Sequence, residues 1–298
     1  MEFLISGMES LRLPSYAKIN LALFIKGKRG DGYHNIETLL QQITLHDEIE
    51  LKATPTAEIE FACSDAMVPG GMANLCVRAA YLLKLRAGTK PGADITLHKT
   101  IPAGAGLGGG SSNAAVVILG LNKLWNLNWP AARLRELAAE LGSDVPFFID
   151  GGAALGEGRG ERLRIINIEW DLPIVVVFPV VPISTKWAYG QLNLNLTIRK
   201  KYIKLSHFKN RNFNDVEFYQ GFGNDFEQVV FRNYPDLLLI KNRLKESGAI
   251  YASLSGSGSS IFGIFGDWGA ASAAKSVFEE RYPVFVTRPI RWGFEQLS

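Results

Sequence analysis

The sequence predicts an α+β protein of two domains, on three observations. The chain has 298 residues, and one domain usually takes roughly 100–200. Strand-like and helix-like segments alternate in its second half, and a glycine-rich segment separates a strand pattern from a helix pattern in its first half. The character of the sequence changes near Trp170. We therefore place a boundary at residues 169–172, with one domain over 1–170 and the other over 171–298.

The first half begins with a strand pattern at residues 16–25, where apolar side chains alternate. Lys18 and Asn20 are two positions apart, so this strand presents both on one face. Further strands are expected at residues 39–45, 48–52 and 94–99. Helices are expected at residues 74–85, from the glycine-rich segment to Leu124, and at 131–141, where Gly142 follows the last turn. A further short helix is expected to begin near residues 143–146.

The second half starts with a run of β-branched residues at 174–178, which is typical of a buried strand. The later expectations are a helix at 237–247, a glycine-serine run at 253–260, a strand at 261–265, a helix at 270–281 and a strand at 284–287.

The composition excludes several classes of protein. A net charge of +3 is too small to indicate nucleic-acid binding. The longest apolar stretch, residues 172–183, contains three prolines and is shorter than the roughly 20 residues of a spanning helix, and no signal peptide is expected at the amino end. Cys63 and Cys76 match no metal or redox spacing. We expect a soluble cytoplasmic protein with reduced thiols and a small-molecule partner, without a membrane or nucleic-acid partner.

Residues 102–112 carry the strongest chemical signal. They contain five glycines and two serines, and no side chain larger than Leu107. Backbone N–H groups can approach a phosphate only where side chains do not block the way. The following helix would present its unpaired N–H groups and the positive end of its dipole. Ser111 and Ser112 add hydroxyls that could reach a phosphate or a metal-bound water. The segment therefore predicts an anion-binding loop, against the alternative of a plain solvent loop.

Three common nucleotide motifs do not fit this loop. No Gly-Lys-Ser/Thr follows the glycines, which excludes a Walker P-loop. Gly104, Gly106 and Gly109 satisfy GxGxxG, but the acidic residue expected about 20 positions later is absent between Leu119 and Pro130. The sequence Asp-Trp-Gly at residues 267–269 has no preceding His-Arg-Asp loop, so a protein kinase is also excluded.

Three motifs in this order resemble those of the superfamily that contains galactokinase, homoserine kinase, mevalonate kinase and phosphomevalonate kinase. They are Ala-Lys-Ile-Asn-Leu at 17–21, Pro-Ala-Gly-Ala-Gly-Leu-Gly-Gly-Gly-Ser-Ser-Asn-Ala-Ala at 102–115, and Leu-Ser-Gly-Ser-Gly at 254–258. Four further segments are similar to the branch that acts on a cytidine diphosphate sugar alcohol. They are Arg-Gly-Asp-Gly-Tyr-His at 29–34, Gly-Ser-Asp-Val-Pro-Phe-Phe at 142–148, Pro-Ile-Ser-Thr at 182–185 and Asn-Asp-Phe-Glu at 224–227.

This resemblance spans about residues 12–290 and implies an S5-like amino half and a ferredoxin-like carboxyl half, with the active site in the cleft between them. It implies ATP and Mg²⁺, and phosphorylation of the 2-hydroxyl of the sugar alcohol in the non-mevalonate route to isoprenoids. The ten or so residues before Leu11 and the stretch 198–219, with its basic run, match no family pattern.

The resemblance also implies the roles of individual residues. Lys18 and Asp144 would form the catalytic pair, although spacing alone would make them a strand-surface lysine and a helix cap. The expected ATP-binding residues are Pro102, Ala103, Gly104, Ala105, Gly106, Leu107, Gly108, Gly109, Gly110, Ser111 and Ser112. The expected substrate-binding residues are Asn20, Tyr33, His34, Thr185 and Tyr189, and the third motif contributes Ser255, Gly256, Ser257 and Gly258.

Two other functions stay open at this point. One is a kinase of the same superfamily for a small alcohol such as homoserine or mevalonate, although Tyr33 and His34 favour a substrate with a base. The other is a nucleotide-binding regulator without catalysis, which the presence of both Lys18 and Asp144 disfavours. Metal ligands are not predicted, and monomer and homodimer are both open.

Overall fold

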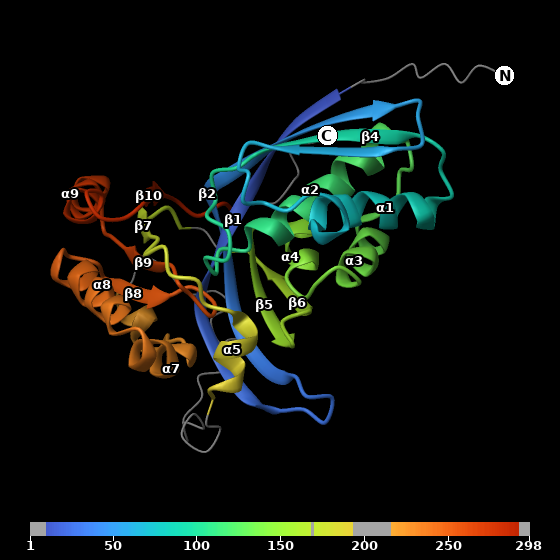
Figure 1. The fold of residues 1–298 in the computed structure, drawn as a ribbon. Helices are drawn as coiled ribbons and strands as arrows, with labels where there is room; N and C mark the ends of the chain where they lie inside the picture. Colours follow the sequence, from blue (N-terminus) through green and yellow to red (C-terminus); the bar gives the residue numbers. More distant parts are fainter. Residues whose placement is uncertain (1–9, 168–169, 193–215, 292–298) are drawn as a thin grey trace. The chain divides into compact units, whose positions relative to one another are not determined.

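The computed structural model describes residues 10–167, 170–192 and 216–291 (Figure 1). Its contacts group the chain into two compact units. Unit 1 comprises Met1–Tyr16, His46–Ala103 and Gly109–Asp150, and unit 2 comprises Ala17–Leu45, Gly104–Gly108 and Gly151–Ser298. Strands β1 (Ser10–Lys28) and β2 (His34–Thr54) therefore each contribute one part to each unit. The predicted boundary at residues 169–172 stays a prediction.

Unit 1 combines a small sheet with helices. Strand β4 (Gly92–His98) pairs in parallel with β3 (Ile59–Cys63) and antiparallel with the second part of β2. The helical elements are η1 (Gly71–Ala73), α1 (Leu75–Ala87), α2 (Gly109–Leu124), α3 (Ala131–Ala139) and α4 (Val145–Asp150). A Cβ on Gly120 of α2 would lie 2.3 Å from the Leu51 side chain of β2, so this glycine lets helix and sheet approach closely.

Unit 2 contains a four-stranded antiparallel sheet in the order β10-β7-β9-β8. Its strands are β7 (Ile174–Val177), β8 (Tyr251–Leu254), β9 (Ile261–Ile264) and β10 (Val284–Thr287). The first part of β2 pairs with β5 (Ala153–Gly158), which pairs with β6 (Arg162–Ile166). The helical elements are α5 (Thr185–Gly190), η3 (Val216–Gly221), α7 (Phe226–Asn233), α8 (Pro235–Glu246) and α9 (Trp268–Phe278).

A hydrophobic core packs the four-stranded sheet of unit 2 against helices. It includes alternate residues of β7, Val175 and Val177, together with the apolar stripes of α8 and α9. All four residues of β7 are fully buried, so both faces of this strand are covered, and its two edges pair with β10 and β9. This confirms the expectation of a buried strand, drawn from its β-branched run.

Most predicted elements are present, with shifted ends. The two strands expected at 39–45 and 48–52 are one continuous strand, β2, because its 21 residues contain no glycine or proline to turn the chain. Helix α9 starts at Trp268, before the predicted residue 270, because the Asp267 side chain caps the N–H of Ala270 at 2.8 Å. The basic run at 199–211 lies outside the described residues. In the described part of the chain, no helix is long and apolar enough to cross a membrane.

Candidate active site

The glycine-rich loop has a backbone that only glycine adopts easily. Gly104, Gly106 and Gly108 have φ angles of +66°, +77° and +71°, in the left-handed region that side chains disfavour. Alternation of left-handed and ordinary residues turns successive N–H groups into a concave anion-binding nest. In the described part of the chain, the N–H groups of Gly106 and Gly108 donate to no other backbone carbonyl. The loop therefore fits the phosphates of a nucleotide.

The three motifs meet around this loop within unit 2. The Lys18 N–H donates to the Leu107 carbonyl at 2.9 Å, and the Ser260 N–H donates to the Ala105 carbonyl at 3.1 Å. The Ser255 hydroxyl donates to the Gly106 carbonyl at 2.9 Å. A Cβ on Gly106 would lie only 2.1 Å from the Ser255 carbonyl oxygen. The first and third motifs thus hold the loop through its carbonyls, which leaves its N–H side for a ligand.

Lys18 is a buried lysine, 4% exposed. Its Nζ donates to Asn20 Oδ1 at 2.6 Å and to the Gly106 carbonyl at 3.0 Å. These contacts confirm that Lys18 and Asn20 share a strand face. Asn20 Nδ2 donates to the Thr38 hydroxyl at 2.9 Å, and that hydroxyl donates to the Ala22 carbonyl at 2.8 Å. This series of hydrogen bonds fixes which end of the Asn20 amide faces the ammonium. The hydrogen bonds to the ammonium offset the cost of burying its charge.

Asp144 belongs to unit 1, where it lies partly exposed directly before α4. The turn that leads to it is closed by the Val145 N–H, which donates to the Gly142 carbonyl at 3.3 Å. Lys18 lies in unit 2, and the pairing of Asp144 with Lys18 stays a prediction.

The residues expected to recognise a base form an aromatic group in unit 2. The His34 and Tyr189 rings are stacked, with centroids 4.9 Å apart and an interplanar angle of 17°. Tyr189 also packs edge-on against Phe226. Burial, aided by the positive charge of Lys28, holds the pKa of His34 below its usual value of 6.5. The imidazole is therefore neutral at pH 7 and offers one donor and one acceptor.

The other expected substrate residues differ in their surroundings. Tyr33 is 57% exposed, and the Arg159 guanidinium lies 5.1 Å from its ring centroid. Thr185 opens α5, and its hydroxyl lies 3.0 Å from that of Ser257 in the third motif. Both contacts are within unit 2.

A buried carboxylate in unit 1 was not predicted. Asp47 is fully buried. One of its oxygens accepts the N–H groups of Thr100 and Ile101, both at 2.7 Å, and the other accepts Asn113 Nδ2 at 2.9 Å. Lys99 Nζ pairs with the same carboxylate at 2.9 Å. Asp47 thus joins the chain just before the glycine-rich loop to the first turn of α2. In the sequence of β2, Asp47 occupies one of the alternate positions that apolar residues otherwise fill, and this pattern could have identified it.

The two serines of the loop motif have different environments. Ser112 is fully buried, and its hydroxyl accepts that of Ser15 at 2.8 Å in unit 1. This hydroxyl therefore takes part in holding the start of α2 in place. Ser111 is half-buried in the same turn.

One group of possible metal ligands occurs among the described residues. Ligand atoms of Glu48, Glu50 and His98 all lie within 4.8 Å of one another. The Arg12 guanidinium, however, already pairs with both glutamates. We interpret the group as a surface charge cluster of unit 1.

Comparisons with known proteins agree with the motifs. Residues 74–152 match the family described as GHMP kinases N terminal domain, and residues 209–284 match GHMP kinases C terminal. A 4-diphosphocytidyl-2-C-methyl-D-erythritol kinase of Chloroherpeton thalassium is 41% identical, covering 92% of this chain and 95% of that protein. The kinase of the same name from Geobacter sulfurreducens is 42% identical, covering 92% and 96%.

Solved structures show the same fold. A crystal structure of 4-(cytidine 5'-diphospho)-2C-methyl-D-erythritol kinase matches with a TM-score of 0.77 and 31% identity, covering 94% of this chain and 99% of that one. Homoserine kinase from Cytophaga hutchinsonii matches with a TM-score of 0.70 at 18% identity, which shows the fold alone, over 98% of each chain. The predicted GHMP kinase fold is confirmed. The chain belongs to the GHMP kinases and, within them, to the family of 4-diphosphocytidyl-2-C-methyl-D-erythritol kinases.

Proposed function

We propose that this protein transfers the terminal phosphoryl group of ATP to the 2-hydroxyl of 4-diphosphocytidyl-2-C-methyl-D-erythritol, in the non-mevalonate route to isoprenoid precursors. One observation carries the proposal: Lys18, the glycine-rich loop and the third motif, which are far apart in sequence, are hydrogen-bonded together in one unit. The similarity to kinases of that name over more than nine-tenths of the chain supports the choice of substrate.

The nest of residues 104–108 binds the phosphates of ATP through its N–H groups, and the dipole of α2 adds to the attraction. Mg²⁺ bound to those phosphates would neutralise charge that develops on the phosphoryl oxygens. Ser111 offers a hydroxyl toward such an ion. Glu48, Glu50 and His98 are not used for it, because the Arg12 guanidinium already pairs with both glutamates.

Asp144 accepts the proton of the substrate hydroxyl, and magnitudes constrain when it does so. A free aspartate has a pKa of about 3.9 and a hydroxyl is about as weak an acid as water, near 15.7. Full ionisation before attack would cost roughly 16 kcal/mol. A turnover of about 10 per second allows only about 16 kcal/mol for the whole barrier. The proton is therefore transferred as the new P–O bond forms.

Lys18 forms the catalytic pair with Asp144 and opposes the negative charge that develops during transfer. Its ammonium is already held by Asn20 Oδ1 and the Gly106 carbonyl, so its position is fixed before substrate arrives. Asn20 binds the substrate near the transferred group.

His34 recognises the cytosine base. Its neutral imidazole can both donate to and accept from the pyrimidine edge. Tyr189 holds the imidazole by stacking and extends the aromatic surface on which the base lies. A substrate without a base would make no use of this pair. A cytoplasmic location is also proposed, and the free thiols of Cys63 and Cys76 support it.

The test is an ADP-release assay with three alcohols: the cytidyl sugar alcohol, homoserine and mevalonate. We expect turnover only with the first, and turnover of homoserine or mevalonate alone would refute the substrate assignment. Asp144→Asn should lower kcat about 10²–10⁴-fold while ATP still binds, and near-normal turnover would remove Asp144 as the base. His34→Ala should raise the KM of the cytidyl alcohol far more than that of ATP. Equal changes in both constants would contradict base recognition.

A further inference from the structure

The segment Asn224–Glu227 has no part in the function so far, yet it lies beside the strand that carries Lys18. The Leu23 N–H donates to the Gly223 carbonyl at 2.9 Å, and the Asp225 N–H donates to the Leu23 carbonyl at 3.0 Å. Asp225 Oδ2 also accepts the Ile25 N–H at 2.7 Å. The segment thus pairs with β1 only a few residues from Lys18, within unit 2.

The buried amide of Asn224 connects this segment to the third motif. Its Nδ2 donates to the Leu254 carbonyl at 2.8 Å and to the Gly256 carbonyl at 2.7 Å, which uses both of its N–H groups. Its Oδ1 accepts the Phe226 N–H at 3.0 Å. Because Oδ1 faces an N–H donor, the orientation of the amide is fixed. Asn224 therefore determines where the carbonyls on either side of Ser255 lie.

The chain at Gly256 lies against the Lys18 ammonium. Gly256 has a φ of +58°, and a Cβ placed on it would lie 3.4 Å from Asn20 Oδ1 and 3.5 Å from Lys18 Nζ. The neighbouring Ser255 holds the Gly106 carbonyl. A shift of this turn would therefore move both the surroundings of the ammonium and the support of the glycine-rich loop.

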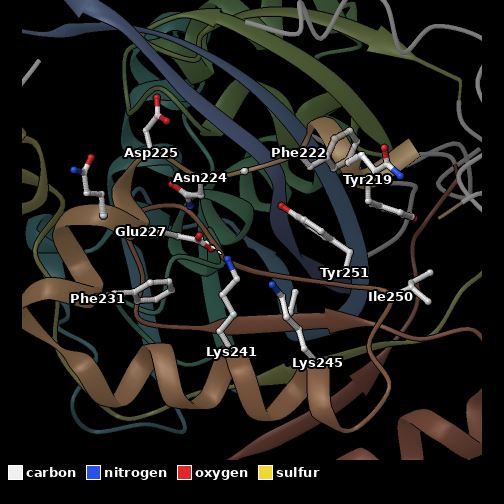
Figure 2. A pocket seen from close by; sticks show the side chains of 14 residues that line it. Tyr219, Phe222, Asn224, Asp225, Glu227, Phe231, Lys241, Lys245, Ile250 and Tyr251 are labelled. Atoms are coloured by element: carbon white, nitrogen blue, oxygen red, sulfur yellow. Dashed lines mark hydrogen bonds and ion pairs between the residues drawn. The ribbon is translucent and has the colours of Figure 1, made fainter. Parts of the chain in front are cut away.

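Glu227 reinforces the same connection. One of its oxygens accepts the Ser253 hydroxyl at 2.9 Å and the Leu254 N–H at 3.1 Å, and the other pairs with Lys241 at 2.5 Å. Asn224, Asp225 and Glu227 are among the residues that line a cavity of about 780 Å³. Figure 2 shows these side chains and the ion pair between Lys241 and Glu227 beside them. Phe226 anchors the segment in the core of unit 2, and the hydrogen bonds of Asn224 and Glu227 set its register with the third motif.

We infer that Asn224 is a positioning residue for phosphoryl transfer: it holds the turn at Gly256 against Lys18 and the glycine-rich loop, a role that rests on the proposed function. It touches no reacting atom. Its loss should therefore lower kcat through a displaced turn. Because the same turn supports the glycine-rich loop, the KM of ATP should change more than the KM of the cytidyl alcohol.

Two variants of Asn224 and one matched control test this role. Asn224→Ser has a side chain too short to reach both carbonyls, and Asn224→Asp keeps the shape but turns an acceptor toward them. The control is Asn233→Ser, because Asn233 also donates its amide to a carbonyl, that of Val229 at 2.8 Å, at the far end of α7. Both serine variants lose amide hydrogen bonds, but only one of them lies at the third motif.

We expect each Asn224 variant to lower kcat at least tenfold with the KM of the cytidyl alcohol within about threefold, while Asn233→Ser keeps the wild-type kcat. The Asn224→Asp variant should regain activity relative to wild type from about pH 8 to about pH 6, because a carboxyl among carbonyls has a raised pKa and donates a hydrogen bond once protonated. A kcat within twofold of wild type in a folded Asn224 variant would overturn the role, as would equal losses in Asn224→Ser and Asn233→Ser.

Hydrogen–deuterium exchange gives a second readout that needs no substrate and applies even to a poorly active variant. In Asn224→Ser, the N–H groups of Ser255 and Gly258, which close this turn, should exchange at least tenfold faster than in Asn233→Ser. Equal exchange would also overturn the role. If wild type turned over none of the alcohols, the proposed function would fail, and the exchange experiment would still decide whether Asn224 holds the turn.

Discussion

Replacement of Gly106 by alanine should damage both the stability and the activity of this kinase. The new Cβ would lie 2.1 Å from the Ser255 carbonyl oxygen, whereas real Cβ atoms essentially never approach within 3.0 Å, so one of the two chains must move by at least about 0.9 Å. The left-handed backbone at Gly106 adds about 1–2 kcal/mol of strain for alanine. Loss of the hydrogen bonds from Lys18 and Ser255 to the Gly106 carbonyl would add about 2–4 kcal/mol.

The expected destabilisation is thus about 3–6 kcal/mol, a large fraction of the 5–15 kcal/mol typical of folded proteins. A displacement of about 1 Å near reacting groups can lower the rate about 10²-fold. Gly88→Ala is the matched control, because Gly88 has a similar φ of +63° and no atom within 4 Å of the added Cβ. It should lose only the strain of about 1–2 kcal/mol and keep full activity.

Urea unfolding measures the free energy of unfolding of both variants, and ADP release measures kcat/KM. The physical reasoning would be refuted if Gly106→Ala were no less stable than Gly88→Ala and kept kcat/KM within twofold of wild type. It would also be refuted if both variants lost activity equally, since strain alone would then explain the effect.

Three further predictions concern ionisable groups: the partly buried His34 and the buried Asp47 and Cys76. Partial burial lowers the pKa of His34 below 6.5, so as pH falls the unfolded chain binds a proton at this site before the folded chain does. The stability contributed by neutral His34 is therefore complete above about pH 6.5 and is lost below it. The free energy of unfolding should fall less between about pH 7.5 and 5.5 in His34→Gln than in wild type. Asp47→Asn should cost about 3–5 kcal/mol in urea unfolding, because it leaves the Lys99 ammonium buried without its counter-charge, and adding Lys99→Met should restore part of that loss. Burial raises the pKa of the Cys76 thiol to about 12, so iodoacetamide should leave Cys76 unmodified in the native protein, by mass spectrometry, and react with it only after unfolding.

Each of these predictions has an outcome that contradicts it. For His34, it is an equal pH dependence of stability in wild type and variant. For Asp47, it is a double variant no more stable than the single one, which would show that the uncompensated ammonium is not the cause. For Cys76, it is alkylation of the native protein at the rate of a free thiol.

Local structure and the chemistry of the motifs could be predicted from the amino-acid sequence. Alternation along β1 placed Lys18 and Asn20 on one face, and the β-branched run of β7 indicated a buried strand. Both patterns follow from backbone geometry over a few residues, so neighbouring side chains suffice to read them. The glycine-rich loop could also be predicted from the sequence, because the left-handed backbone at Gly104, Gly106 and Gly108 strongly favours glycine.

Which distant groups come into contact depends on how the whole chain folds. The Lys18 ammonium donates to the Gly106 carbonyl, which is 88 positions away in the sequence, and the Ser255 hydroxyl donates to the same carbonyl across 149 positions. Asn224 donates to the Gly256 carbonyl, and Asp47 pairs with Lys99. Both roles depend on partners that the fold buries away from water. A buried polar group must find a partner or lose stability, but the identity of that partner depends on how the whole chain packs. No local sequence pattern specifies it.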